Sequence, residues 1–226
     1  MTIAFNLTKV LQRIEHSVNK YRTEGDLIRL IAVSKTRPSE MILTAHEQGQ
    51  KDFGESYVQE AIDKIEQLED MDICWHFIGP VQSNKTSKIA QYFDWCQSVD
   101  RLKIARRLSN QRPDDKPPLN ICIQLNVSHE LTKSGTSVNE ALELARAIDS
   151  LPNLVLRGLM AIPMKTDNFD SQREAFAEMY ELYTQLKDQY DTVDTLSMGM
   201  SGDMEAAIAE GSNMVRVGTD IFGPRK

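Results

Sequence analysis

The first candidate for chemistry in this sequence is Lys35. It follows the apolar run 27–34 (LIRLIAVS), which predicts a buried strand that ends at the lysine. Burial disfavours an ammonium ion and lowers its pKa. The neutral amine that results can form a Schiff base with an aldehyde. An ordinary lysine on a solvated loop is the alternative, and the residues around Lys35 do not by themselves decide between the two.

A second candidate is an anion site in segment 198–203 (MGMSGD), which joins a predicted strand to a predicted helix. Ser201 is placed to cap that helix, so its hydroxyl and nearby backbone N–H groups could donate to a phosphate. Met198 and Met200 alternate with smaller residues and could pack on a planar ring, although core packing explains either one. Turn geometry alone would explain the glycines.

The last strand supplies a third group, in segment 216–219 (RVGT). Gly218 lets a ligand approach the backbone closely, and Thr219 adds a hydroxyl. Arg216 shares a side of the strand with Gly218 and could point inward, where it would need an anion or another acceptor. An ion pair with a neighbouring acidic residue is the alternative for Arg216.

The elements that must position these residues alternate along the chain. Eight short apolar runs are separated by amphipathic helical segments, and an amphipathic helix precedes the first run. Parallel strands need such crossovers, so we predict an α/β fold: a single (β/α)8 barrel of the TIM type over residues 1–226, with an N-terminal helix. A doubly wound open sheet remains the alternative. The predicted strands are 27–34, 51–56, 74–79, 94–99, 119–127, 154–162, 195–201 and 213–223.

Such a barrel gathers its chemistry at the carboxyl ends of its strands, and it often binds phosphate in the loops after strands seven and eight. Lys35, Ser56, Ser201 and Arg216 all stand at or near such ends. The sequence therefore predicts that one mouth of the barrel collects an amine, a guanidinium, hydroxyls and glycines.

Composition excludes several classes of protein. The formal net charge of −7 argues against general binding of nucleic acid or of an anionic membrane. No apolar run approaches the roughly 20 residues that span a bilayer. The three cysteines, Cys74, Cys96 and Cys122, lack CxxC spacing and stand in apolar runs, which favours buried thiols over zinc or disulfides. The four histidines form no cluster in the sequence, and His76 fits a barrel lining. We expect no metal and a cytoplasmic protein.

Taken together, these segments resemble the pyridoxal phosphate homeostasis protein family. The resemblance runs in order along nearly the whole chain and rests on AVSKT (32–36), FGESYVQE (53–60), HFIGPVQSNK (76–85), LTKSG (131–135), LSMGMSGDMEAAI (196–208) and RVGTDIFG (216–223). It implies a barrel like the N-terminal domain of alanine racemase, with pyridoxal 5′-phosphate as the cofactor, bound as a Schiff base to Lys35.

The resemblance also assigns the rest of the site. It implies that Ser201, Gly218 and Thr219 contact the phosphate and that Arg216 faces the pyridine nitrogen. Met200, which could pack on a planar ring, is also expected to bind the cofactor. The family usually has FGENY where this chain has FGESY, so Ser56 replaces an asparagine near the cofactor with a side chain that is shorter but still polar.

We expect a cofactor carrier without dedicated catalysis, since an arginine at the ring nitrogen weakens the electron sink. Racemisation also needs a second acid–base group, which the racemase takes from another domain, and this sequence ends soon after Gly223. The alternatives are a small amino-acid racemase and a barrel enzyme with an aldolase-type lysine. The expected partners are the cofactor and apo-enzymes that depend on it, and the expected state is a monomer. Lys85 and Lys133 are either candidates for cofactor transfer or ordinary surface lysines.

Overall fold

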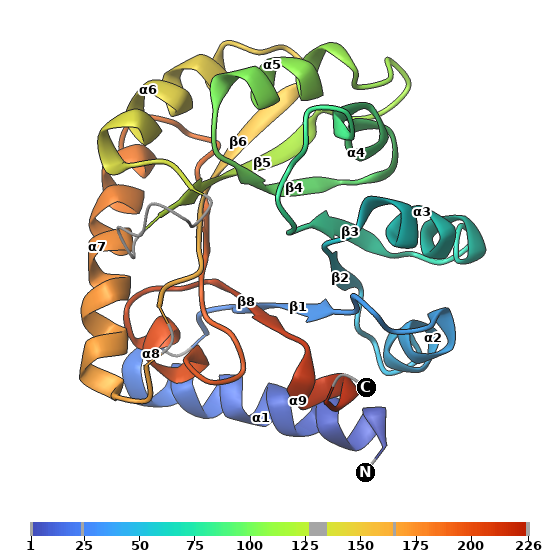
Figure 1. Ribbon diagram of the computed structural model, residues 1–226. Helices are drawn as coiled ribbons and strands as arrows, with labels where there is room; N and C mark the ends of the chain where they lie inside the picture. Colours follow the sequence, from blue (N-terminus) through green and yellow to red (C-terminus); the bar gives the residue numbers. More distant parts are fainter. Residues whose placement is uncertain (1, 24, 127–134, 165, 225–226) are drawn as a thin grey trace.

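The computed structural model describes residues 2–23, 25–126, 135–164 and 166–224. Eight parallel strands close into a barrel in sequence order, with β1 paired to both β2 and β8 (Figure 1). This confirms the predicted (β/α)8 barrel and excludes an open sheet. The strands are β1 (Arg29–Val33), β2 (Asp52–Glu55), β3 (Cys74–Phe77), β4 (Trp95–Val99), β5 (Leu119–Leu125), β6 (Leu154–Ala161), β7 (Thr195–Ser197) and β8 (Met214–Val217).

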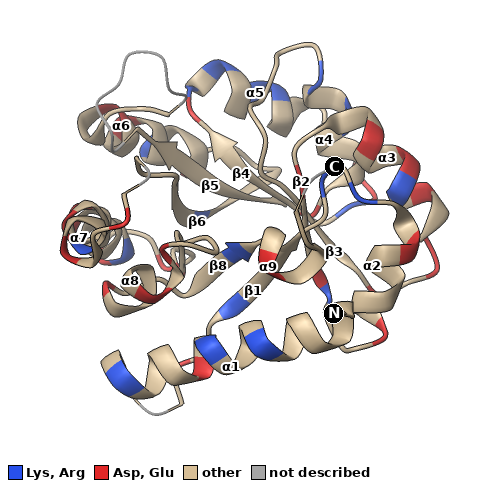
Figure 2. Cartoon of the chain, turned by 60° about the horizontal axis from the view of Figure 1, so that its bottom comes forward, with Lys and Arg blue, Asp and Glu red and all other residues tan. Residues whose placement is uncertain are grey.

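Helices form a ring outside the strands (Figure 1). Charged residues lie mainly on these helices and on the loops, whereas most strand residues are uncharged (Figure 2). This is expected for parallel strands, which are covered on both faces. The helices are α1 (Ile3–Tyr21), α2 (Ser39–His46), α3 (Val58–Gln67), α4 (Thr86–Tyr92), α5 (Leu102–Asn110), α6 (Val138–Asp149), α7 (Phe169–Lys187), α8 (Met204–Ala209) and α9 (Thr219–Phe222).

The apolar core has two parts. The larger part fills the space between the strands and the ring of helices. The smaller part lies inside the barrel and consists of Ile31, Trp95, Cys122, Met160 and Met214. At the amino ends of the strands, the Trp95 ring stacks on His76 at 5.2 Å, and the guanidiniums of Arg29 and Arg157 lie over it. This end of the barrel is therefore closed by packed side chains.

The β6–β7 contact depends on a glycine. Gly158 has φ +144°, and a Cβ at this position would lie 1.9 Å from the Thr195 carbonyl oxygen. A larger residue would push the two strands apart, so the barrel could not close here without Gly158.

The N-terminal helix covers the outside of the barrel below β1 and β8 (Figure 1), where it packs against α8 and α9. It buries Leu7, Val10, Ile14 and Val18 on one face, which confirms the predicted amphipathic helix. Leu11 is 47% exposed. None of the helices in the described part of the chain combines the length and the hydropathy that crossing a membrane requires.

Two local predictions were wrong. The eighth strand does not run to residue 223: it ends at Val217, and α9 follows, burying Ile221 and Phe222. The apolar pattern of 213–223 fits either one long strand or a strand followed by a helix. The chain turns after Val217, where it leaves the barrel and packs beneath α1. Ser201 does not cap α8 either, since that helix begins at Met204 with Asp203 as its N-cap residue. A capping box of Ser137 and Glu140 begins α6.

Candidate functional site

The site predicted from the sequence lies at the carboxyl ends of the strands. Lys35 is half-buried and stands two residues beyond the end of β1, in the turn that leads to α2. On one side of it, a Cβ at Gly218 would lie 3.2 Å from the carbonyl oxygen of Val33. On the other side, the Ser34 N–H donates to the Gly54 carbonyl. The Lys35 turn therefore sits between the ends of β8 and β2.

The remaining predicted residues lie around the same mouth. Arg216 is 4% exposed in β8, and its backbone N–H donates to the Gly199 carbonyl in the loop after β7. Met200 and Ser201 follow in that loop and are half-buried, whereas Thr219 is exposed at the start of α9. Met198 is buried and belongs to the core, which is the core-packing alternative given from the sequence.

Ser56 and Lys85 occupy loops at this same end. Ser56 is half-buried after β2, and its carbonyl oxygen would lie 2.3 Å from a Cβ at Gly79, so the loops after β2 and β3 are in close contact. Lys85 is exposed at the N-cap of α4. Lys133, the other lysine considered for cofactor transfer, lies outside the described residues.

The turn that carries Lys35 is strained. Thr36 has φ +62°, and it is the one non-glycine residue in the described part of the chain with a positive φ. The left-handed region costs a residue with a Cβ about 1–2 kcal/mol, and a β-branched side chain makes the conformation rarer still. Such strain persists only where the surroundings impose it, and it is concentrated at functional sites.

A buried ionic cluster imposes this conformation. The Lys64 ammonium group donates to a carboxylate oxygen of Glu55 at 2.7 Å, to Glu60 at 2.6 Å and to the Ser34 carbonyl at 2.9 Å. The Ser34 hydroxyl donates to the same Glu55 oxygen at 2.7 Å, and the Thr36 N–H donates to Glu60 at 2.5 Å. The residues on either side of Lys35 are thus tied to one cation and two carboxylates. We refer to Glu55, Glu60 and Lys64 as the turn cluster.

The turn cluster has an unsatisfied atom. Glu55 is fully buried, and burial raises the pKa of its carboxyl group above the ordinary value. Its second oxygen, Oε2, has no hydrogen-bond partner among the residues that the structure describes. A buried acceptor without a partner is rare in folded proteins and calls for an explanation such as a strained or functional site.

Arg216 is a buried cation at the mouth of the barrel. Within the described residues its guanidinium forms no ion pair: one terminal nitrogen donates to the Ser197 hydroxyl at 2.6 Å and the other to the Ala161 carbonyl at 2.7 Å. Burial lowers the pKa of Arg216 to about 10, so it remains charged at neutral pH. The ion pair considered as an alternative from the sequence is therefore absent from the described part of the chain.

Loops after β7 and β8 are tied together from outside by α1. The Arg13 guanidinium donates to the Asp220 carboxylate at 2.5 Å and to the Ser201 carbonyl at 3.0 Å. The Asn6 amide donates to the Ile221 carbonyl at 3.0 Å. These are the two loops in which barrels of this fold place phosphate, so α1 braces the predicted phosphate site.

The chain is similar over its length to known proteins. The family model of the alanine racemase N-terminal domain matches residues 10–226. The pyridoxal phosphate homeostasis protein of Pasteurella multocida (strain Pm70) is 52% identical over 229 residues, which cover 100% of this chain and 98% of that protein. The chain belongs to the pyridoxal phosphate homeostasis protein family.

Solved structures agree with that family. PipY of Synechococcus elongatus PCC7942, in a structure with PLP bound, is 33% identical to this family member, with a TM-score of 0.84 over 98% of this chain and 100% of PipY. The alanine racemase of Clostridium difficile 630 is 16% identical, with a TM-score of 0.67 over 98% of this chain and 56% of the racemase. The second likeness concerns the fold alone.

Proposed function

We propose that this protein binds pyridoxal 5′-phosphate at the mouth of the barrel, with Lys35 as the covalent attachment point, and serves in homeostasis of that cofactor without dedicated catalysis. The observation that carries the proposal is Arg216, a buried guanidinium that has no carboxylate partner among the described residues and stands at the same barrel end as Lys35. A buried charge of this kind is costly unless it is paired with an opposite charge or another electron-rich group. Relatives about 50% identical over the full chain carry the name pyridoxal phosphate homeostasis protein.

The residues at the mouth fit this cofactor. Lys35 supplies the amine for the aldehyde carbon, and Arg216 supplies a donor for the ring nitrogen. Gly218, Thr219 and Ser201 supply small side chains, hydroxyls and backbone N–H groups in the two loops suited to phosphate. Met200 is half-buried beside them. Ser56 is also half-buried at this end and keeps a polar group where relatives usually carry asparagine.

When bound, pyridoxal phosphate supplies a reactive aldehyde and an electron-withdrawing ring. The protein's own residues determine how that reactivity is used. The turn cluster fixes the backbone on both sides of Lys35 and so orients its amine. Arg216 donates N–H to the ring nitrogen and, as a fixed cation, disfavours protonation of that nitrogen. An unprotonated ring is a weaker electron sink, which favours holding the cofactor over turning over a substrate.

The test is an absorption spectrum of the protein with pyridoxal phosphate, wild type beside Lys35→Ala, followed by borohydride reduction and mass mapping. We expect a band that is lost in the variant and a reduced pyridoxyl group on Lys35. Adducts spread over surface lysines would refute the assignment. Lys51→Ala is the control, because Lys51 is an exposed lysine at the opposite end of the barrel.

The same sample tests the absence of dedicated catalysis. Sustained interconversion of D- and L-amino acids by the loaded wild-type protein would favour the racemase alternative. Transfer of the cofactor to an apo-enzyme, with no such turnover, would support the homeostasis function. Lys85→Ala measured in the same transfer assay decides whether that lysine takes part.

A further inference from the structure

A chain of hydrogen bonds runs through the inside of the barrel from Arg216 to the opposite end. The Arg216 guanidinium donates to the Ser197 hydroxyl at 2.6 Å, and Ser197 donates to the Gln97 side-chain oxygen at 2.6 Å. The Gln97 amide nitrogen lies 2.9 Å from Nδ1 of His76, and Nε2 of His76 lies 2.9 Å from a carboxylate oxygen of Asp52. We call these five residues the lumen chain. Its members come from β8, β7, β4, β3 and β2.

Almost all of the lumen chain is shielded from water. Ser197, Gln97 and His76 are completely buried and Arg216 nearly so, while the Asp52 side chain is 22% exposed at the amino end of β2. Buried polar groups of this kind are costly unless each is satisfied. Here they are satisfied by one another, and a fully satisfied buried network rigidifies its members.

The two ends fix the direction of every hydrogen bond. Arginine can only donate and an ionised carboxylate can only accept, so Ser197 must accept from Arg216, and its own hydrogen goes to the Gln97 oxygen. The Gln97 nitrogen then donates to Nδ1 of His76. The reverse orientation of the Gln97 amide would leave the Ser197 hydroxyl facing two donors, with its own hydrogen unplaced.

His76 is therefore the neutral tautomer with its proton on Nε2, which donates to Asp52. Burial lowers the pKa of His76, so the ring is neutral at neutral pH. For Asp52, burial raises the pKa, but the hydrogen bond from His76 and the positive charge of Arg29 lower it, and the net shift is downward, so the carboxylate stays ionised.

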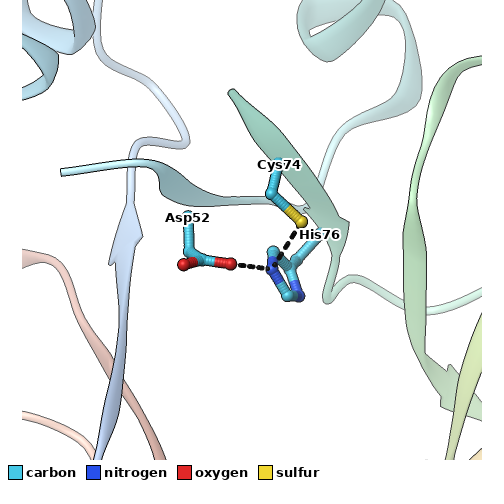
Figure 3. A group of neighbouring side chains, drawn as sticks. All are labelled: Asp52, Cys74 and His76. Carbon is cyan, nitrogen blue, oxygen red and sulfur yellow. Dashed lines mark hydrogen bonds and ion pairs between the residues drawn. The ribbon is translucent and has the colours of Figure 1, made fainter. Parts of the chain in front are cut away.

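This tautomer also bears on whether the cluster around Nε2 of His76 could bind a metal ion. Asp52 and the Cys74 sulfur both approach this nitrogen, the latter at 3.4 Å, in a grouping that could hold a metal ion (Figure 3). The sequence prediction of isolated histidines did not foresee the grouping. A histidine that binds a metal through one nitrogen donates a proton from the other, but Nδ1 faces the Gln97 donor. Metal binding at Nε2 would require the lumen chain to reverse.

We propose that Ser197 and Gln97 are positioning residues for Arg216, and that the lumen chain holds its guanidinium in one orientation at the mouth. This inference rests on the proposed function. Ser197 provides one of the two acceptors that hold Arg216, and Gln97 orients Ser197. Removal of either frees a buried guanidinium to rotate, and the donor offered to the ring nitrogen is lost or displaced.

The first experiment needs neither a variant nor the cofactor. Nitrogen NMR of the ligand-free wild-type protein reports the tautomer of His76. We expect a neutral ring with its proton on Nε2. A proton on Nδ1 would overturn the direction of the lumen chain and with it the proposal.

The second experiment compares Ser197→Ala with Ser212→Ala. Ser212 is a matched control, because it is a completely buried serine between β7 and β8 whose hydroxyl contacts the carbonyls of Leu196, Met198 and Met214 but not Arg216. Pyridoxal phosphate is titrated into each protein while the absorption band and the dissociation constant are recorded.

We expect Ser197→Ala to shift the band and to raise the dissociation constant roughly tenfold, as expected for loss of a hydrogen bond to a charged group. Ser212→Ala should keep the wild-type band, and Ser197→Thr, which keeps the hydroxyl, should restore it. Gln97→Met carries the same expectation as Ser197→Ala and replaces it should that variant not fold. Identical bands in Ser197→Ala and Ser212→Ala would overturn the proposal. A wild-type protein that binds no pyridoxal phosphate on Lys35 would instead refute the proposed function, and the tautomer of His76 would still decide the direction of the chain.

Discussion

Lys64 is the residue on which the geometry of the Lys35 turn depends. Its ammonium group has three acceptors, from Glu55, Glu60 and the Ser34 carbonyl, and its side chain is 7% exposed. Removing one member of a buried ion pair leaves an uncompensated charge and costs about 3–5 kcal/mol. Exposed pairs contribute at most about 1 kcal/mol.

We therefore predict that Lys64→Met lowers the free energy of unfolding by about 3 kcal/mol at pH 7, measured by chemical denaturation. Lys51→Met is the matched control, because Lys51 pairs with Asp72 on the surface, and its loss should leave the free energy of unfolding nearly unchanged. Equal losses in the two variants would contradict the role given to the turn cluster.

The penalty should depend on pH with a definite sign. Burial already raises the pKa of Glu55 in the folded protein, and loss of the Lys64 charge raises it further. A carboxyl group that binds its proton more tightly when folded destabilises the protein as pH rises above its unfolded pKa. The Lys64→Met penalty should thus be smaller at pH 5 than at pH 8, and adding Glu55→Gln should remove most of that difference.

The sequence predicted the positions of single residues better than their contacts. Lys35 and Ser201 could be located because a residue that follows a buried strand must lie at the mouth of the barrel, and Arg216 because it stands near the carboxyl end of its strand. The turn cluster could not, since it joins residues on β2 and α3 through side chains. Gln97 and Ser197 were missed because a polar residue inside an apolar strand run has no local pattern that reveals its partner.

The first helix is the element that links the outside of the barrel to the predicted phosphate loops. Arg13 in α1 contacts both loops, through the Asp220 carboxylate and the Ser201 carbonyl. Side chains that are half exposed contribute little to folding, and the Arg13 side chain is 48% exposed. Its effect should therefore appear in ligand binding more than in stability.

We predict that Arg13→Ala weakens binding of pyridoxal phosphate about threefold to tenfold while changing the free energy of unfolding by less than about 1 kcal/mol. Spectral titration and denaturation measure the two quantities. Lys9→Ala, one turn earlier on the same helix, is the control. Lys9 contacts the Phe5 ring and, within the described residues, forms no ion pair with the predicted phosphate loops. If Lys9→Ala weakens binding as much, the brace formed by Arg13 has no special role.

Element boundaries show where sequence patterns stop being informative. The eight strands were predicted in number and order because each buried run is bounded by polar loops. The final run was assigned as one strand, yet it divides at Gly218 into β8 and α9. Hydrophobic residues at 221 and 222 satisfy either structure, and only packing beneath α1 selects the helix.

At the scale of the whole molecule, the two ends of the chain complete the same barrel. β1 pairs with β8, so that Ile31 lies opposite Arg216, and Asn6 of α1 donates to the Ile221 carbonyl in α9. Unfolding of either end would open the sheet and expose the apolar core. Because both ends close the same barrel, we expect the chain to unfold as one cooperative unit, and the single domain inferred from the sequence stays a prediction.

We predict a single thermal unfolding transition that is the same when followed by tryptophan fluorescence and by far-ultraviolet circular dichroism. Pyridoxal phosphate at about 100 times its dissociation constant stabilises the folded state by about 2.7 kcal/mol, which for a chain of this size raises the midpoint by about 5–10 °C. Lys35→Ala should unfold in one transition too, but without that rise. Two separated transitions would contradict a single cooperative barrel. The two proteins differ only in the side chain of residue 35. An equal rise of the midpoint in Lys35→Ala would therefore mean that the cofactor stabilises the fold through contacts that do not involve the lysine.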